Sequence, residues 1–588
     1  MQFTACRIGD VIIMKNRLIK KITAAAMAFA MIGGAISAPA SDKPLLGSIL
    51  NANAAGSYAS LNPTTGVLTI GGEINKNMLE PYSISAKIII ADESTVLPED
   101  CSRLFEFFGA KEIDLSKADT SNVKNMHNMF GSCFNLTSVN LSNFNTKNVT
   151  DMAYLFYCCD LESIDLSGFD TSNVENMRGM FYGCNFLKGL DLSSFNTTNV
   201  TDMAYMFNNC ISIKSLDLSN FNTSSVKDMS TMFGNCYSLK DIDISSFDTE
   251  NVEKMNLMFE GCTSLSSLDL SNFNTSNVNI MRSMFEGCTS LSTLDLSSFT
   301  VGKDTDSRFM FLNSPSLQSN ICRVIGKTVT LDGYIGANIY LKPSEKLAKI
   351  VMSGPNGDKE ITDFSGVIQE DGAYKFTYPI NAAQADELIT FKAYDKYGNR
   401  LIVCDHKDNL LDHSQASCTV YGYIDEIKEY DVYSEPKLAK LVDSLENYCK
   451  AADNYFDGAE KTIDGIDGIK AEDVAKYAPK FGNEVKLSLV LNSATAMRVY
   501  LNADKVMLGD SVLSPKTGKY GTYREISNIP AQKLCSAYDV TADGTEYKFV
   551  PLSYVYRVLN NANASKQLTE MAKATYVYAH AAVAYVTQ

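Results

Sequence analysis

The segment SLDLSNFNTSSVKDMSTMFGNC, which runs from Ser215 to Cys236, decides the fold class because the chain repeats it. A near-identical segment, SLDLSNFNTSNVNIMRSMFEGC, begins 52 residues later at Ser267. The true period is half of that, since a triplet of the Asp-Leu-Ser type starts at Asp114, Asn140, Asp165, Asp191, Asp217, Asp243, Asp269 and Asp295. The steps are 26 residues, apart from one of 25. Tandem copies at a fixed period predict a repeat protein in which each unit packs against its neighbours.

One unit predicts three local structures in a fixed order. Apolar and polar residues alternate around Leu216 and Leu218, which is typical of a strand with one face in the core. The FNT motif favours a corner, because Asn and Thr side chains can bond the backbone. Apolar residues from Val226 to Phe233 recur at three- and four-residue steps, which predicts a helical or 3-10 segment. The expected fold class is an α/β repeat solenoid with a parallel sheet and short helical or 3-10 segments, followed by duplicated α+β modules.

Cysteine and threonine each recur at one position of successive units. The cysteine ladder is Cys133, Cys158, Cys184, Cys210, Cys236, Cys262 and Cys288. Disulfides between neighbouring coils are one interpretation, but the flanking Met and Phe residues favour buried thiols that behave as small hydrophobes. The threonine ladder is Thr120, Thr146, Thr171, Thr197, Thr223, Thr249 and Thr275. We interpret it as structural, because such a ladder most often holds a turn together.

The aspartates of the repeated triplets form the candidate binding row. Its members are Asp165, Asp191, Asp217, Asp243, Asp269 and Asp295. If the strand prediction is right, all six leave the sheet on the same side, and neighbouring carboxylates ~5 Å apart repel. Ser hydroxyls, backbone amides, cations or a basic partner must compensate this repulsion. The row is therefore either turn architecture or a stripe that captures a cationic or metal-bridged ligand.

At this point the unit resembles a known family. The motifs LDLSNFNTSNV and MFEGC are similar to the 26-residue surface-protein repeat of the BspA-like leucine-rich repeats, over about Ala86 to Leu317. The resemblance implies a secreted or cell-surface bacterial protein with an adhesive or binding role. The chain has Phe where general leucine-rich repeats have Asn or Cys, so a generic horseshoe curvature does not follow.

The N-terminus has the features of an export signal. MKNRLIKK from Met14 is basic, Ile22 to Ala38 is apolar, and APA ending at Ala40 fits a cleavage site, so we expect translation to start at Met14. The mature protein has no further apolar run of membrane-spanning length. The expected domains are a signal peptide at 1–40, an N-terminal cap at 41–85, the repeats at 86–318, a first β module at 319–430, a helix and linker at 431–478, and a second β module with a C-terminal helix at 479–588.

The C-terminal half contains an internal duplication. Leu438 and Leu568, Tyr448 and Tyr578, and Tyr455 and Tyr585 are among the similar pairs that lie 130 residues apart on two predicted helices. Ser434 is the expected N-cap of the first helix, with Pro436 in its first turn. Asp464 and Asp467 in the linker lack the spacing of a calcium loop. This half is similar to a region of exported proteins of gut Clostridia, a resemblance that implies no activity.

Composition and motifs narrow the function classes. A formal net charge of −16 disfavours nucleic acid as a partner, and four scattered histidines disfavour a metal site. We found no phosphate loop or hydrolase motif, and Cys404 beside His406 lacks an orienting third group. We therefore expect a non-catalytic surface protein that needs no cofactor and binds protein or glycan ligands of host or microbes. The alternative is a secreted hydrolase or glycan-processing protein with its active site in the C-terminal half.

Overall fold

The computed structural model describes residues 56–331, 334–369, 371–480, 485–491 and 495–587. The predicted signal peptide and the first part of the predicted cap lie outside the described residues. The chain divides into two compact units, Met1–Asn51 and Ala52–Gln588, so all of the described residues belong to the second unit. In this part of the chain, no helix is sufficiently long and apolar to span a bilayer.

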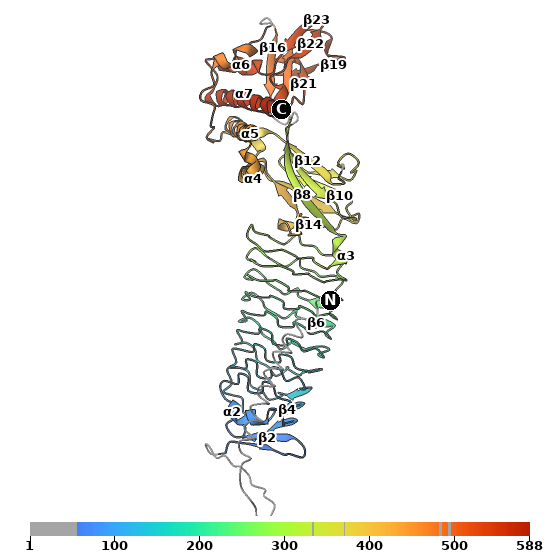
Figure 1. The fold of residues 1–588 in the computed structure, drawn as a ribbon, viewed down its shortest axis with the longest axis vertical. Coiled ribbons are helices and arrows are strands. Elements are labelled where there is room, and N and C mark those ends of the chain that lie inside the picture. Colours follow the sequence, from blue (N-terminus) through green and yellow to red (C-terminus); the bar gives the residue numbers. More distant parts are fainter. Residues whose placement is uncertain (1–55, 332–333, 370, 481–484, 492–494, 588) are drawn as a thin grey trace, which may run out of the picture. The chain divides into compact units, whose positions relative to one another are not determined.

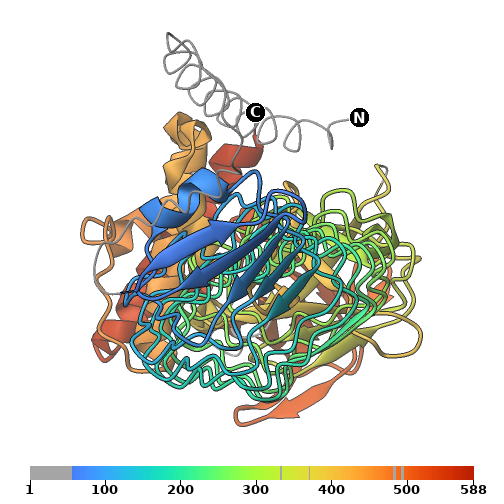
Figure 2. The same cartoon turned by 90° about the horizontal axis from the view of Figure 1, so that it is seen from below.

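The repeats stack as successive coils of one chain (Figure 1). At the N-terminal end, Figure 2 shows five strands side by side, in the order β1-β2-β3-β4-β5. The strands of the repeats and of the hairpin before them are β1 (Tyr58–Leu61), β2 (Val67–Gly71), β3 (Ile88–Ala91), β4 (Glu112–Asp114), β5 (Ser138–Asn140), β6 (Ser215–Asp217) and β7 (Asp241–Asp243). Strands β1 and β2 are antiparallel, and the later pairs are parallel. Two short helical elements, α2 (Lys76–Leu79) and η1 (Glu80–Tyr82), connect β2 to β3.

The expected fold class is wrong. No continuous parallel sheet runs along the described repeats, where the named strands are three or four residues long and β6 pairs only with β7. Helices make up 17% of the structure, whose sheets are mostly small and antiparallel or mixed. The strands are short because a turn follows each one at once: the Phe221 N–H donates to the Leu218 carbonyl within the next few residues. Single parallel bridges, such as Asp202 to Asp228, join the coils elsewhere.

The predicted helical segment of each coil is instead a pair of turns. Thr231 and Asn235 both have positive φ, which a right-handed helix does not allow. The N–H groups of Thr231, Phe233 and Asn235 donate to carbonyls of the following coil at 2.6–2.9 Å, so they are unavailable for helical bonds. The three- and four-residue apolar spacing that predicted a helix therefore comes from consecutive turns, which repeat at a similar interval.

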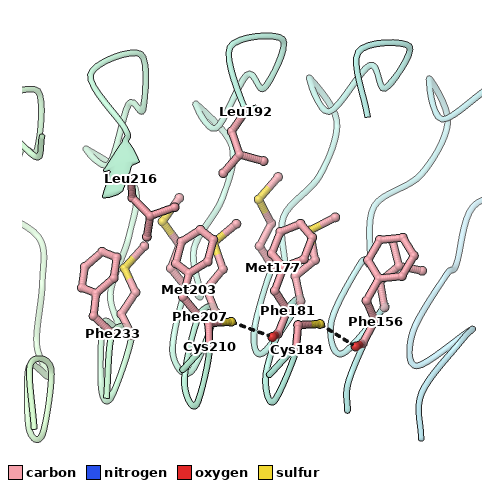
Figure 3. Close-up of a cluster of buried hydrophobic side chains, with 14 of the residues drawn as sticks. Phe156, Met177, Phe181, Cys184, Leu192, Met203, Phe207, Cys210, Leu216 and Phe233 are labelled. Atoms are coloured by element: carbon pink, nitrogen blue, oxygen red, sulfur yellow. Dashed lines mark hydrogen bonds between the residues drawn. The ribbon is translucent and has the colours of Figure 1, made fainter. Parts of the chain in front are cut away.

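Stacked side chains fill the inside of the coils. Phe233 is fully buried, and its ring centroid lies 5.8 Å from that of Phe207 and 5.4 Å from that of Phe259. Such pairs continue without a gap from Phe105 to Phe311. Figure 3 shows the phenylalanine, methionine and cysteine side chains of neighbouring coils side by side in this core. Each coil thus buries its apolar residues only by contact with its neighbours.

The C-terminal half consists of two modules of related plan, each with two four-stranded sheets and a 21-residue helix at its end. The first module contains β8 (Ile321–Thr330), β9 (Ile335–Lys342), β10 (Lys349–Ser353), β11 (Lys359–Ile361), β12 (Tyr374–Ile380), η2 (Ala382–Gln384), β13 (Ile389–Tyr394), β14 (Ile402–Asp405), η3 (Asp412–Ser414), β15 (Ala416–Cys418), α4 (Val420–Glu429), η4 (Asp431–Ser434) and α5 (Pro436–Phe456). The helix α3 (Pro315–Gln318) precedes it. Its two four-stranded sheets have the orders β12-β9-β8-β14 and β11-β10-β13-β15.

The second module repeats this plan with shorter strands. It contains η5 (Ala471–Tyr477), β16 (Lys486–Val490), β17 (Ala496–Tyr500), β18 (Val506–Leu508), β19 (Ser511–Val512), β20 (Lys516–Gly518), β21 (Gly521–Ile526), η6 (Ala531–Lys533), β22 (Tyr538–Ala542), β23 (Thr545–Phe549), α6 (Ser553–Leu559) and α7 (Lys566–Val586). Its sheets have the orders β16-β17-β21-β20 and β19-β18-β22-β23.

Helices α5 and α7 join the two modules. Both are 21 residues long and their bounds differ by 130, as the sequence pairs suggest. The rings of Tyr448 and Tyr578 stack between them at 5.0 Å. The predicted N-cap Ser434 is wrong: Glu435 caps α5 through a 2.6 Å bond from the Leu438 N–H. Pro436 takes the first helical position, so the cap is the residue directly before it.

Candidate functional sites

The acidic row lies on the exposed surface of the coils. All six aspartates, Asp165, Asp191, Asp217, Asp243, Asp269 and Asp295, are exposed. Each accepts a hydrogen bond at 2.8–3.0 Å from the N–H of the serine two residues on. The carboxylates therefore share one orientation relative to their turns. In the described residues none of them forms an ion pair, and Lys188, three residues before Asp191, pairs with Glu162 instead.

In four of these turns, serine donors lower the pKa of the carboxylate. Hydrogen bonds from the Ser167 hydroxyl and N–H lower the pKa of Asp165, although the neighbouring charge of Asp191 opposes the shift. Serine donors likewise lower the pKa of Asp191, Asp243 and Asp269. Each aspartate of the row thus stabilises its own turn, and its carboxylate is exposed to solvent. A binding role for the row stays a prediction.

The threonine ladder is structural, as predicted. The buried Thr223 hydroxyl accepts a bond from the Asp248 N–H at 2.8 Å and donates one to the Asp248 carbonyl at 2.7 Å. The same pair of bonds links Thr146 to Asp170 in an earlier coil. Each hydroxyl therefore fastens one corner to the corner of the next coil, and its single hydrogen is already donated within the stack of coils.

The cysteine ladder consists of buried thiols, with one correction. Cys159, rather than the predicted Cys158, occupies the ladder position and donates to the Phe130 carbonyl at 3.1 Å. Cys158 is only partly buried and has positive φ. This coil is one residue shorter after its ladder cysteine than the other coils. The Met/Leu-Phe-x-x-Cys spacing of the other coils could have identified Cys159 from the sequence. Burial raises the pKa of Cys236 to about 12, so the ladder thiols are not nucleophiles at neutral pH.

Two Cys–His pairs lie in the C-terminal half, and neither has the geometry of a nucleophile and its base. Cys404 is buried and His406 exposed, so they do not face each other. Cys535 lies 4.0 Å from His580 Nδ1, but that nitrogen bonds the Tyr576 carbonyl at 2.8 Å, and Nε2 bonds the Tyr477 hydroxyl at 3.0 Å. The imidazole is therefore the Nδ1–H tautomer and has no lone pair directed at the thiol. Burial also raises the pKa of the Cys535 thiol.

A cavity of about 540 Å³ lies where the last coil meets the first module. Four aspartates line it, and three of them hold loops. Asp412 accepts the Val301 N–H at 2.9 Å, Asp306 pairs with Arg308, and Asp405 accepts the Lys407 and Asn409 N–H groups. Among the described residues, no group of three or more His, Cys, Asp or Glu side chains could hold a metal ion.

A second cavity, of about 310 Å³, lies in the C-terminal half and was missed by the sequence analysis. Tyr455, Tyr500, Tyr520 and Tyr554 line it together with Arg498, and its lining contains no carboxylate. These residues are distributed over α5, β17, the β20–β21 turn and α6. The pairing of Tyr455 with Tyr585 across the duplication was the one signal that pointed to this region.

The comparisons concern the repeats. The model of a family described as "Mycoplasma protein of unknown function, DUF285" matches residues 99–217, 158–243 and 212–324. These overlapping matches cover less than half of the chain, and they agree with a BspA-like repeat protein without specifying the family further. Proteins with this repeat are typically surface-associated. No curated protein matches the chain.

Proposed function

We propose that the protein is an exported, non-catalytic cell-surface protein that binds macromolecules of host or microbes through its repeats. The observation that carries the proposal is the acidic row. Six exposed carboxylates recur at one coil position, each oriented by its own serine and none in an ion pair within the described residues. The match to a typically surface-associated repeat family supports the location.

A row of unpaired carboxylates favours a cationic partner. Neighbouring carboxylates repel, and a ligand with appropriately spaced Lys or Arg residues would relieve that repulsion. Because the row is exposed, salt should weaken binding, since ions screen charges over ~8–10 Å. The second cavity has no carboxylate in its lining, so it gives no support to the alternative of a glycosidase.

The test compares the full chain with a variant in which Asp217, Asp243 and Asp269 are all replaced by Asn. Each replacement retains an oxygen that accepts the serine N–H, so the turns should persist. Both proteins are passed over immobilised host matrix proteins and microbial cell-wall preparations at 50 and 500 mM NaCl. We expect salt-sensitive capture by the parent and little by the variant. Equal capture of the two proteins would contradict a binding role for the row.

A further inference from the structure

The 310 Å³ cavity combines exposed aromatic rings with an apolar floor. Tyr455 is 40% exposed and Tyr520 is 69% exposed, while Val555 and Met571 below them are buried. Burial raises the pKa of Tyr554, and the nearby Tyr455 and Tyr520 add to this effect, which indicates that the three phenols are close to one another. Large aromatic side chains exposed around a hollow are typical of binding sites rather than of a core.

The lining has positive charges and no negative ones. Arg498 and Lys519 line the cavity, and Lys519 Nζ lies 5.4 Å from the Tyr520 ring centroid. Glu525, outside the lining, accepts bonds from Arg498 Nε at 2.8 Å and Lys516 Nζ at 2.7 Å, so both of its oxygens are occupied. Lys519 has no ion-pair partner in the described residues. Although the chain has a net charge of −16, the positive lining of this cavity is suited to an anionic group.

The duplication supplies a related tyrosine cluster in the first module. Tyr585, at the end of α7, is 130 residues after Tyr455 and is 39% exposed, almost as much as its counterpart. Burial raises the pKa of Tyr423 on α4, and the charges of Glu426, Tyr585 and Tyr340 raise it further. Tyr340 on β9 corresponds to Tyr500 on β17. Each module thus places tyrosines of its own beside a tyrosine from the long helix of the other module.

We propose that the second-module cavity binds a sugar residue that carries a carboxylate. The apolar face of a sugar ring packs against aromatic faces, while tyrosine hydroxyls are suited to its hydroxyl groups. Arg498 and Lys519 would bind the carboxylate through charge-assisted bonds. A hydrophobic or proline-rich peptide would pack against the aromatic rings but would not bind the charged groups of Arg498 and Lys519. This inference rests on the proposed surface-binding function and adds a second site with its own ligand class.

The experiment is isothermal titration calorimetry of the full chain with three defined sugars, followed by competition with a proline-rich peptide. Oligogalacturonate and sialyllactose both carry carboxylates but represent different sources of acidic sugar, and cellohexaose is a neutral control. We expect at least one acidic probe to bind and cellohexaose not to bind. The Lys519→Gln variant should bind the acidic sugar about tenfold more weakly or worse, because it loses one charge-assisted bond. Tyr520→Ala should also weaken it, whereas Tyr397→Ala, which removes an exposed tyrosine elsewhere, should not.

Three results would overturn the inference: no binding of either acidic probe, equal binding of cellohexaose, or binding of a proline-rich peptide that displaces the acidic probe. Lys519 and Tyr520 lie in the turn between β20 and β21, so these variants should fold, which circular dichroism would check. The triple Asp-to-Asn variant of the acidic row distinguishes the two proposals. It should retain binding of the acidic sugar even if it loses capture of macromolecules, and loss of both would contradict the assignment to the cavity.

Discussion

Replacement of Thr223 by Val tests how the coils are held together. Thr and Val have the same shape, but Val lacks the hydroxyl that joins two coils. In the structure this hydroxyl is buried and bonds both the N–H and the carbonyl of Asp248, at 2.8 and 2.7 Å. Val therefore removes both bonds and leaves the two backbone groups of Asp248 without their partner.

The expected cost follows from these two groups. An unsatisfied buried donor or acceptor costs ~1–3 kcal/mol. The side chain of Asp248 is exposed, so water can reach part of this corner and the lower half of the range applies. We expect Thr223→Val to reduce the free energy of local opening by about 3 kcal/mol, or roughly a hundredfold in the opening equilibrium. Thr223→Ser retains the hydroxyl and loses one methyl group, which costs about 0.8 kcal/mol.

Hydrogen exchange with mass spectrometry measures this cost locally, because a chain of several modules does not unfold in two states. The peptide that contains Asp248 should exchange roughly a hundredfold faster in the Val variant and only slightly faster in the Ser variant. Peptides from α5 and α7 provide an internal control and should not change. If the Val and Ser variants exchange alike, the hydroxyl does not fasten the coils and our interpretation of the threonine ladder is wrong.

Two further predictions concern the core of the coils. Phe233→Ala should lower the free energy of local opening of its coil by ~3–5 kcal/mol, since the fully buried ring stacks on both neighbours. Phe186→Ala, at a side chain that is 51% exposed, should change it by less than ~0.5 kcal/mol. Hydrogen exchange of peptides from the surrounding coils measures both, and parent-like exchange in the Phe233→Ala protein would show that this ring is not core. Iodoacetamide at pH 8 should modify the partly buried Cys158 well before Cys159 or Cys236, because the fully buried ladder thiols have a raised pKa (about 12 for Cys236) and stay protonated below it. Peptide mapping would refute this if Cys159 reacted first.

The sequence by itself determined which residues of the repeats face inward. A residue that recurs every 26 positions meets the same residue of the next coil, so apolar identity at Leu216, Phe233 and Cys236 predicts burial without knowledge of the backbone. The same reasoning identified the threonine ladder. The 130-residue offset between the helices was also visible, because a 21-residue helix retains its apolar spacing through duplication.

The tertiary structure alone decided the backbone path and the second cavity. Residues Val226–Phe233 have a helical apolar pattern, but the N–H groups of Met229, Thr231 and Phe233 bond the next coil. A bond to another coil excludes the local bond that a helix needs. No pattern within one unit reveals that competition. The cavity joins Tyr455 of α5 to Tyr520 and Tyr554, which lie 65 and 99 residues further along the chain, and only the packing of α5 against the second module brings them together. Spacing within a segment records which face of that segment is buried, whereas contacts between distant segments depend on how those faces meet.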